Sequence, residues 1–448
     1  MSKPVENLTD ALLDAAQKAG ADAADAIAVA GDSQSIEVLN GALEHAERAE
    51  GIDIGLRVFI GKKQAVVSTS DVRPETMQVV AERAVAMARE APDDPHCGLA
   101  DPAQLARNWD VDVLELADPV AAPSASDLQN DALEAEAAAL AVTGVSQTQS
   151  AGASYSRTEI HISASNGFSG GYVRTSRATS CVAITGEGLA MERDYYGEGR
   201  VFAADLPDPR EIGRLAGERT VARFGAKRPP TGAFPVLFDE RIAAGLIGHM
   251  VVALNGASIA RGSSWLKDAL GEMVLPKGMS LIENPHRARV SGSKPFDGEG
   301  LPTSQRTIIE NGVLQGWTLD LASGRKLGLD STANAARGTS APPSPMAGNL
   351  SLTQGSDSRA DLIAMMGTGL IVTSLIGSSI NANTGDYSRG ASGFWVENGV
   401  ITGPVNECTI AGNLREMLGS IRAANDARAH LSRVIPSLLV EGLTIAGE

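Results

Sequence analysis

Five prolines fall between residues 91 and 125, too many for a regular helix or strand to form there. We therefore predict a linker in this stretch. A second break, Lys227-Arg-Pro-Pro-Thr-Gly232, interrupts the chain again further on. At 448 residues the chain is long enough for two or three domains of roughly 100–200 residues each. The predicted division is an N-terminal domain (1–95), a linker (96–124), a middle domain (125–230) and a C-terminal domain (231–448).

Helix and strand signals alternate on both sides of the linker. Residues 7–19 place Leu8, Leu12 and Ala16 on one stripe before Gly20, which predicts an amphipathic helix. Short apolar runs separated by turns with glycine predict antiparallel strands. The expected strands of the first two domains are 26–30, 35–39, 52–60, 64–68, 152–164 and 171–185, and the further helices are 74–90, 125–142 and 209–223.

The C-terminal domain carries one apolar helix, at about 240–254, and many strand-like runs. Asn311-Gly312 and Asn398-Gly399 each lie between apolar strand residues, the strongest short-range signal for a β-hairpin. We predict an α+β fold, in which N-terminal helix and antiparallel-sheet domains precede a larger, mostly β domain. A strand edge of that last domain could bind an extended peptide by strand addition.

Charge and composition exclude several classes of function. The formal charge of −16 repels phosphate backbones, so nucleic-acid binding is not expected. No run of about 18 apolar residues predicts a membrane helix, and the first residues lack a secretory pattern. Three scattered cysteines suit a reducing compartment. We expect a cytoplasmic protein.

The strings that resemble catalytic motifs are better interpreted as structural features. Gly167-Phe-Ser-Gly-Gly171 matches the nucleophile-elbow string of hydrolases, but it joins two strand-like runs and predicts a hairpin turn instead. No two of the six histidines lie within one helical turn of each other, so no local zinc motif is present. His249 lies in the apolar helix and is interpreted as a core histidine.

Two polar clusters mix acids, bases and tyrosine. The first contains Glu192, Arg193 and Asp194, and the second contains Asp386, Tyr387 and Arg389. Such groups serve as ligand clamps and equally as interdomain salt-bridge networks. We favour the structural role and keep both clusters as candidates for a peptide or interface site.

These clusters belong to a set of strings through which the chain resembles the TldD/PmbA family, and specifically its PmbA (TldE) branch. The similarity runs nearly end to end. The matching strings are Gly51-Ile-Asp-Ile-Gly-Leu-Arg-Val58, Ser68-Thr-Ser-Asp71, Met191-Glu-Arg-Asp-Tyr195, Phe296-Asp-Gly-Glu-Gly300, Arg325-Lys-Leu-Gly328, Thr384-Gly-Asp-Tyr-Ser-Arg-Gly390, Gly393-Phe-Trp-Val-Glu-Asn-Gly399 and Thr409-Ile-Ala-Gly-Asn-Leu414.

The resemblance implies a heterodimer whose TldD subunit binds zinc through a His-Glu-x-x-x-His helix and a distant cysteine. In this chain the three helix positions are Ile247, Gly248 and Val252, none of which can ligate zinc or act as a base. The tail has Ser432-Arg-Val-Ile-Pro-Ser-Leu-Leu439 in place of the cysteine. Residues five apart also lie about 140° apart around a regular helix. We therefore expect no catalytic residue and no metal in this chain, and zinc in its partner.

The leading hypothesis is a non-catalytic subunit that pairs with a TldD-like zinc protease and is active only in that complex. The resemblance implies unfolded or modified peptides as substrates, including microcin-type precursors and a gyrase-linked antitoxin. One alternative is an autonomous hydrolase that uses Glu192, Asp194, Asp386 and Arg389. Another is a homodimeric peptide-binding protein.

Overall fold

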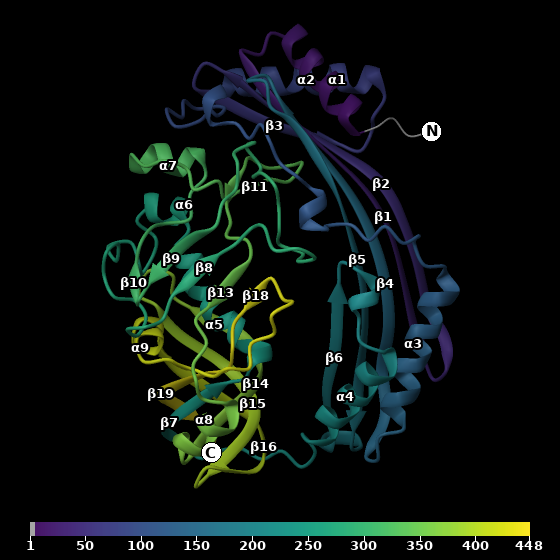
Figure 1. Ribbon diagram of the computed structural model, residues 1–448, viewed down its shortest axis with the longest axis vertical. Coiled ribbons are helices and arrows are strands. Elements are labelled where there is room, and N and C mark those ends of the chain that lie inside the picture. The colour runs from purple at the N-terminus through teal and green to yellow at the C-terminus, as the bar shows by residue number, and fades with distance from the viewer. Residues whose placement is uncertain (1–4) are drawn as a thin grey trace.

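The computed structural model describes residues 5–448. Strands from the predicted N-terminal and middle domains form one six-stranded antiparallel sheet in the order β3-β2-β1-β4-β5-β6 (Figure 1). Its strands are β1 (Ala23–Leu39), β2 (Ala42–Ile60), β3 (Lys63–Thr69), β4 (Val145–Ala164), β5 (Ser169–Thr185) and β6 (Glu192–Arg200).

The two central strands of this sheet, β1 and β4, pair with each other. In the sequence, β1 precedes the proline-rich stretch and β4 follows it. The register places Ile27 opposite Ile162 and Val29 opposite Ile160. The turn predicted between residues 30 and 35 is wrong, because Gly31 pairs with Gly51 on β2 and with Thr158 on β4 inside one continuous strand. Residues 91–124 contain only two short 3-10 helices, Pro102–Gln104 and Asp112–Leu114.

Four helices cover one face of the sheet: α1 (Val5–Lys18), α2 (Pro74–Glu90), α3 (Ala125–Leu140) and α4 (Pro209–Val221). Side chains alternate between the faces of a strand. Ala24, Ala26 and Ala28 of β1 therefore pack beneath α1 and α2, while Ile36 and Val38 pack beneath α3 and α4. The opposite face, including Ile27, is left for the C-terminal domain.

The C-terminal domain contains two principal sheets. One has the order β16-β15-β14-β7-β19-β17, and the other β10-β9-β8-β13-β18. Their strands are β7 (Gly232–Phe238), β8 (Leu281–Glu283), β9 (Arg306–Glu310), β10 (Val313–Leu314), β13 (Leu350–Leu352), β14 (Gly369–Ile380), β15 (Asp386–Glu397), β16 (Val400–Asn413), β17 (Arg422–Ala423), β18 (Arg433–Val434) and β19 (Leu438–Ala446). A small third sheet pairs β11 (Ala335–Ala336) with β12 (Ser344–Pro345).

Helices pack on both faces of the larger C-terminal sheet. Val236 and Phe238 of β7 contact the core beneath α5, and Leu237 between them points to the opposite face beneath α8. Because β16 also pairs with β19, the sheet closes on itself. This closure shortens the free strand edge of the C-terminal domain that was expected to bind a peptide. The helices are α5 (Glu240–Ala253), α6 (Gly256–Ala260), α7 (Leu321–Leu327), α8 (Arg359–Met366) and α9 (Leu414–Gly419).

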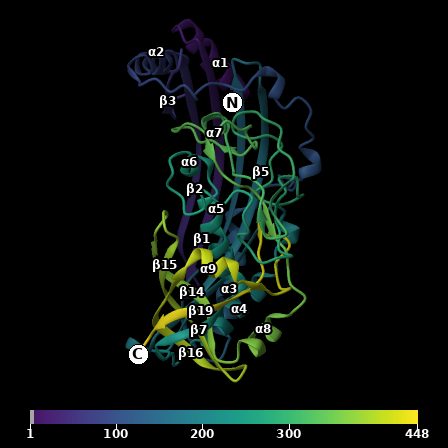
Figure 2. The ribbon, with the colours of Figure 1, turned by 90° about the vertical axis from the view of Figure 1, so that its left-hand side faces the viewer.

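Both predicted Asn-Gly hairpins form. Asn311-Gly312 joins β9 to β10 and Asn398-Gly399 joins β15 to β16, and all four residues have positive φ, as a type I′ turn requires. The α+β prediction, with a larger mostly β C-terminal domain, is confirmed. With the C-terminal domain toward the viewer, the long strands of the N-terminal sheet run behind it (Figure 2). Within residues 5–448 no helix has the length and apolarity to span a membrane.

Candidate functional site

Helix α5 carries the three positions that the resemblance assigns to a degenerate metal motif. Ile247 lies in the core and is 1% exposed, whereas Val252 is 68% exposed. Gly248 is half-buried, on the same side of the helix as Val252. The three positions therefore do not converge, because the helix is regular over this span.

A cation lies beside the central position of this motif. A Cβ atom built on Gly248 would lie 3.0 Å from Nη1 of Arg433, the first residue of β18. Alkyl groups, a glycine and a guanidinium do not fit a zinc site, which needs three or four N, O or S ligands. Across residues 5–448, moreover, no three His, Cys, Asp or Glu side chains converge as metal ligands would.

His249 faces Tyr387 of β15 rather than a carboxylate. The two rings meet edge to face, with centroids 5.8 Å apart. Burial lowers the pKa of His249, and the nearby Arg389 lowers it further. The imidazole is therefore neutral at pH 7, and its surroundings are those of a packed aromatic residue.

The first polar cluster lies between the sheet and the C-terminal domain. Asp194 of β6 accepts hydrogen bonds from Arg241 of α5 at 3.1 Å, and Arg223 lies 3.7 Å away. Glu192 accepts from Asn406 of β16 and lies 3.5 Å from Arg223. The Arg241–Asp194 pair is an interdomain salt bridge and the Asn406–Glu192 contact is an interdomain hydrogen bond, whereas Arg223 lies in the same domain as both carboxylates.

The other member of this cluster, Arg193, takes no part in those ion pairs. It donates to the side chain of Gln149 at 3.0 Å and is exposed. Arg193 therefore bonds to a different partner from Glu192 and Asp194, which share Arg223.

The second cluster lies elsewhere, at the start of β15. Asp386 is exposed and accepts hydrogen bonds from Thr384 at 2.6 Å and Asn413 at 3.1 Å, which lower its pKa. Arg389 donates to the carbonyl of Gly377 at 2.7 Å. Tyr387 is buried, which raises its pKa to about 12. Within the described residues, no hydrogen bond or ion pair joins this cluster to the first.

A second interdomain bridge escaped the sequence analysis. Arg428 donates to Glu198 of β6 at 2.9 Å and to Glu240 of α5 at 2.9 Å. Glu198 also accepts a hydrogen bond from Tyr196, 2.7 Å away. Burial alone would raise the pKa of Glu198, but its hydrogen bonds and the arginines lower it overall. These residues are hundreds of positions apart, and no local motif marks the pairing.

A buried carboxylate links the N-terminal sheet to the loop before β12. Asp25 of β1 lies between Arg57 of β2, at 3.0 Å, and Arg337, at 2.6 Å. Burial alone would raise the pKa of Asp25, but the two guanidiniums bring it below its usual range. Close by, burial and the neighbouring Asp297 raise the pKa of Glu299 to about 8.

The Gly167-Phe-Ser-Gly-Gly171 string lies at the hairpin between β4 and β5, as predicted, with Gly167 and Phe168 in the turn and Ser169 as the first residue of β5. Gly167 has a φ of 96°, which only glycine adopts readily. Ser169 Oγ lies 3.5 Å from His161 Nε2, and the other ring nitrogen contacts Thr9 of α1 at 2.9 Å. The histidine lacks the orienting carboxylate of a Ser-His-Asp triad, so this group ties α1 to the sheet.

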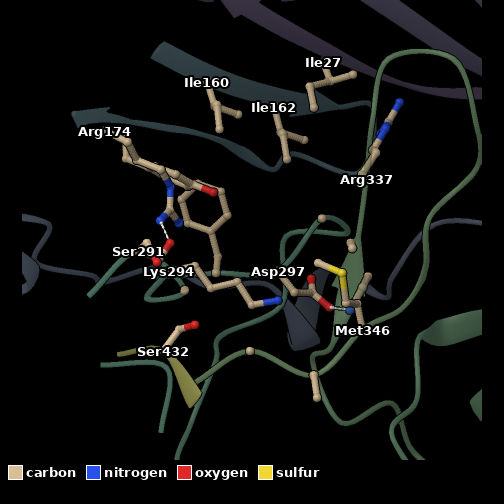
Figure 3. A pocket seen from close by; sticks show the side chains of 18 of the residues that line it. Ile27, Ile160, Ile162, Arg174, Ser291, Lys294, Asp297, Arg337, Met346 and Ser432 are labelled. Carbon is tan, nitrogen blue, oxygen red and sulfur yellow. Dashed lines mark hydrogen bonds between the residues drawn. The ribbon is translucent and has the colours of Figure 1, made fainter. Parts of the chain in front are cut away.

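A cavity away from these bridges lies between the sheet and the C-terminal domain. It has a volume of about 430 Å³, within the range of small-molecule sites. Its walls come from β1, β4 and β5 on one side and from loops of the C-terminal domain on the other (Figure 3). Charged residues at its border are Arg174, Lys294, Asp297, Arg337 and Arg433.

Comparisons with known proteins identify relatives along almost the whole chain. Models of the PmbA/TldA metallopeptidase match domain 1 at residues 24–88, the central domain at 118–224 and the C-terminal domain at 231–447. The chain is 36% identical over 417 residues to metalloprotease PmbA of Escherichia coli O157:H7, covering 92% of this chain and 90% of that protein. It is 37% identical over 466 residues to the PmbA homolog of Haemophilus influenzae, covering 99% and 100%.

Solved structures with the same architecture cover equally large shares. A Bacteroides thetaiotaomicron protein, crystallised as a candidate modulator of DNA gyrase, superposes with a TM-score of 0.89 at 28% identity, covering 99% of this chain and 98% of that one. TldE of Thermococcus kodakarensis superposes with a TM-score of 0.83 at 19% identity, covering 98% and 99%, and so supports the fold alone.

Proposed function

The chain belongs to the PmbA/TldD family of metallopeptidases, and from this premise we propose that it is the non-catalytic subunit of a heterodimeric zinc peptidase of the cytoplasm. A TldD-like partner would supply the zinc and the hydrolytic chemistry. This chain would complete the particle that receives an unfolded or modified peptide, such as a microcin-type precursor or a gyrase-linked antitoxin.

The observation that carries the proposal is the side-chain chemistry of α5 and its neighbour. Ile247 is committed to the core, Gly248 has no side chain, and Arg433 adds positive charge beside it. A metal ion would be repelled by the guanidinium and would lack ligands. The chain therefore supplies neither a metal site nor a general base at this helix.

The polar clusters give little support to an autonomous hydrolase. Catalysis by two carboxylates needs both to lie within reach of the reacting bond of one substrate. Asp194 is paired with Arg241, while Asp386 lies in a separate exposed turn. The geometry therefore supports a non-catalytic subunit better than an autonomous hydrolase.

The test is purification of this chain alone and together with a co-expressed TldD-like subunit. We expect the pair to co-elute, to contain zinc and to cleave an unstructured peptide. The isolated chain is expected neither to contain zinc nor to cleave the peptide. Zinc at one equivalent in the isolated chain, or peptide cleavage by it, would overturn the proposal. Failure of the two chains to co-elute, with this chain forming a dimer, would favour a homodimeric peptide-binding protein instead.

A further inference from the structure

One wall of the cavity is an apolar row that crosses three strands. Val29, Ile160 and Tyr172 are direct cross-strand partners on β1, β4 and β5, and Ile27 and Ile162 form the next row. Val29, Ile160 and Tyr172 are each only partly buried, although the core around Phe296 covers their sides. The row therefore leaves apolar surface open to the cavity, which suits an aliphatic or aromatic ligand group.

The opposite wall holds Lys294, which feels the charges of Asp297 and Glu283 but makes no close ion pair with the part of the chain that the structure describes. Lys294 extends across the cavity, with its amine end directed toward Asp297 (Figure 3). Over residues 5–448 no hydrogen bond engages its Nζ, and no carboxylate oxygen lies within 4.0 Å of it. Burial lowers the pKa of Lys294, partly offset by Asp297, so an unpaired ammonium here is costly.

Most of the other charged side chains around the cavity already make hydrogen bonds or ion pairs within the protein. Arg174 donates to the carbonyls of Ser291 and Ser293, and Arg337 is paired with Asp25. Asp297 accepts hydrogen bonds from the backbone N–H groups of Glu299, Leu301 and Ala335. Lys294 therefore remains available, together with Arg433, whose guanidinium has no hydrogen bond or ion pair to residues 5–448.

We propose that this cavity binds a monocarboxylate carried on an apolar body, namely the free C-terminus of a peptide whose last side chain is aliphatic or aromatic. Lys294 contacts the carboxylate, and the Val29–Ile160–Tyr172 row receives the side chain. A phosphate dianion fits less well, because the Asp297 carboxyl borders the same space. The choice of a peptide over a smaller carboxylic acid rests on the proposed function.

The probe is N-acetyl-Leu-Phe with a free carboxylate, titrated calorimetrically into the isolated full chain. Its C-terminal amide, N-acetyl-Phe and acetate serve as comparison ligands. We expect the acid to bind roughly tenfold or more tightly than the amide, because a charge-assisted hydrogen bond to Lys294 is lost in the amide. N-acetyl-Phe is expected to bind more weakly than the dipeptide, and acetate more weakly still. Equal affinity for acid and amide, or for acetate and the dipeptide, would overturn the proposal.

Two variants test the contributions of the two cavity walls to binding separately. Lys294→Met should remove the preference for acid over amide, whereas Ile160→Ser should weaken both ligands and keep the preference. Lys267→Met changes an exposed lysine of the same domain outside the cavity and should alter neither affinity. Circular dichroism verifies the fold of each variant. Retention of the preference in folded Lys294→Met would contradict the assignment. The titration omits the partner subunit, so its failure would leave the subunit proposal untouched.

Discussion

The guanidinium of Arg433 lies against the bare backbone of Gly248 on α5, with Nη1 3.0 Å from the place of a Cβ atom. The contact joins β18 to the helix at the position that the resemblance aligns with the glutamate of the His-Glu-x-x-x-His motif. A hydrogen in place of a side chain makes room for the arginine, and the arginine in turn makes the position unsuitable for a metal.

Gly248→Ala should stabilise the protein slightly. Alanine is favoured over glycine inside a helix by about 1 kcal/mol, and the only atom that must move is the end of the flexible Arg433 side chain. We expect a gain of roughly 0.5 kcal/mol in the free energy of unfolding, measured with urea. Gly245→Ala has nothing within 4 Å of its new methyl group and should give the full helix gain. A loss of stability at Gly248→Ala would show that Arg433 is rigidly held.

Asp25→Asn should destabilise the fold strongly. The substitution leaves Arg57 and Arg337 buried without their shared counter-ion, a change that costs roughly 3–5 kcal/mol in comparable buried pairs. Since the pKa of Asp25 is lowered in the folded state, its contribution is present above the ordinary pKa and is lost as the pH falls through the folded value. Asp71→Asn breaks an exposed pair with Arg73 and should change the urea midpoint little.

Arg241→Met should loosen the contact between β6 and the C-terminal domain. Asp194 loses its 3.1 Å ionic partner and keeps Arg223 at 3.7 Å and the backbone N–H of Tyr195 at 2.8 Å, a change that we expect to cost roughly 2–4 kcal/mol. Hydrogen–deuterium exchange should accelerate along β6 before the core strands of the C-terminal domain respond. The matched control is Arg228→Met, which breaks an exposed pair with Glu407 and should leave exchange in β6 unchanged.

The free energy of unfolding should fall as the pH rises, because Glu299 is protonated in the folded state. Its pKa is about 8 in the folded state, above the ordinary value of 4.5, so the folded state binds the proton more tightly than the unfolded state. This contribution is complete below pH 4.5 and is lost as the pH rises through 8. Glu299→Gln should therefore flatten the decline in melting temperature between pH 6 and pH 9. An unchanged pH profile in the variant would assign the decline to another group.

Local chemistry made much of the fold predictable. Helix α2 begins and ends at Pro74 and Glu90 as predicted, because apolar periodicity and the initial proline are both local signals. The Asn-Gly hairpins follow in the same way from residues that tolerate positive φ. That Gly248 and Val252 cannot ligate a metal also follows from the sequence, since it depends on residue type alone.

Contacts between distant residues were decided only by the tertiary structure. Nothing around Ile27 indicates that it pairs with Ile162 across the proline-rich stretch, because strand pairing depends on which edges the folded domains bring together. Likewise, packing of the C-terminal loops on the sheet brings Arg337 to Asp25 and places Lys294 at the cavity, with no close ion pair to any residue from 5 to 448. The sequence by itself determined most of the helices and hairpins and the side chains available on α5. The buried charges and the cavity arose from long-range packing, because desolvation makes the free energy of each buried charge depend on its neighbours.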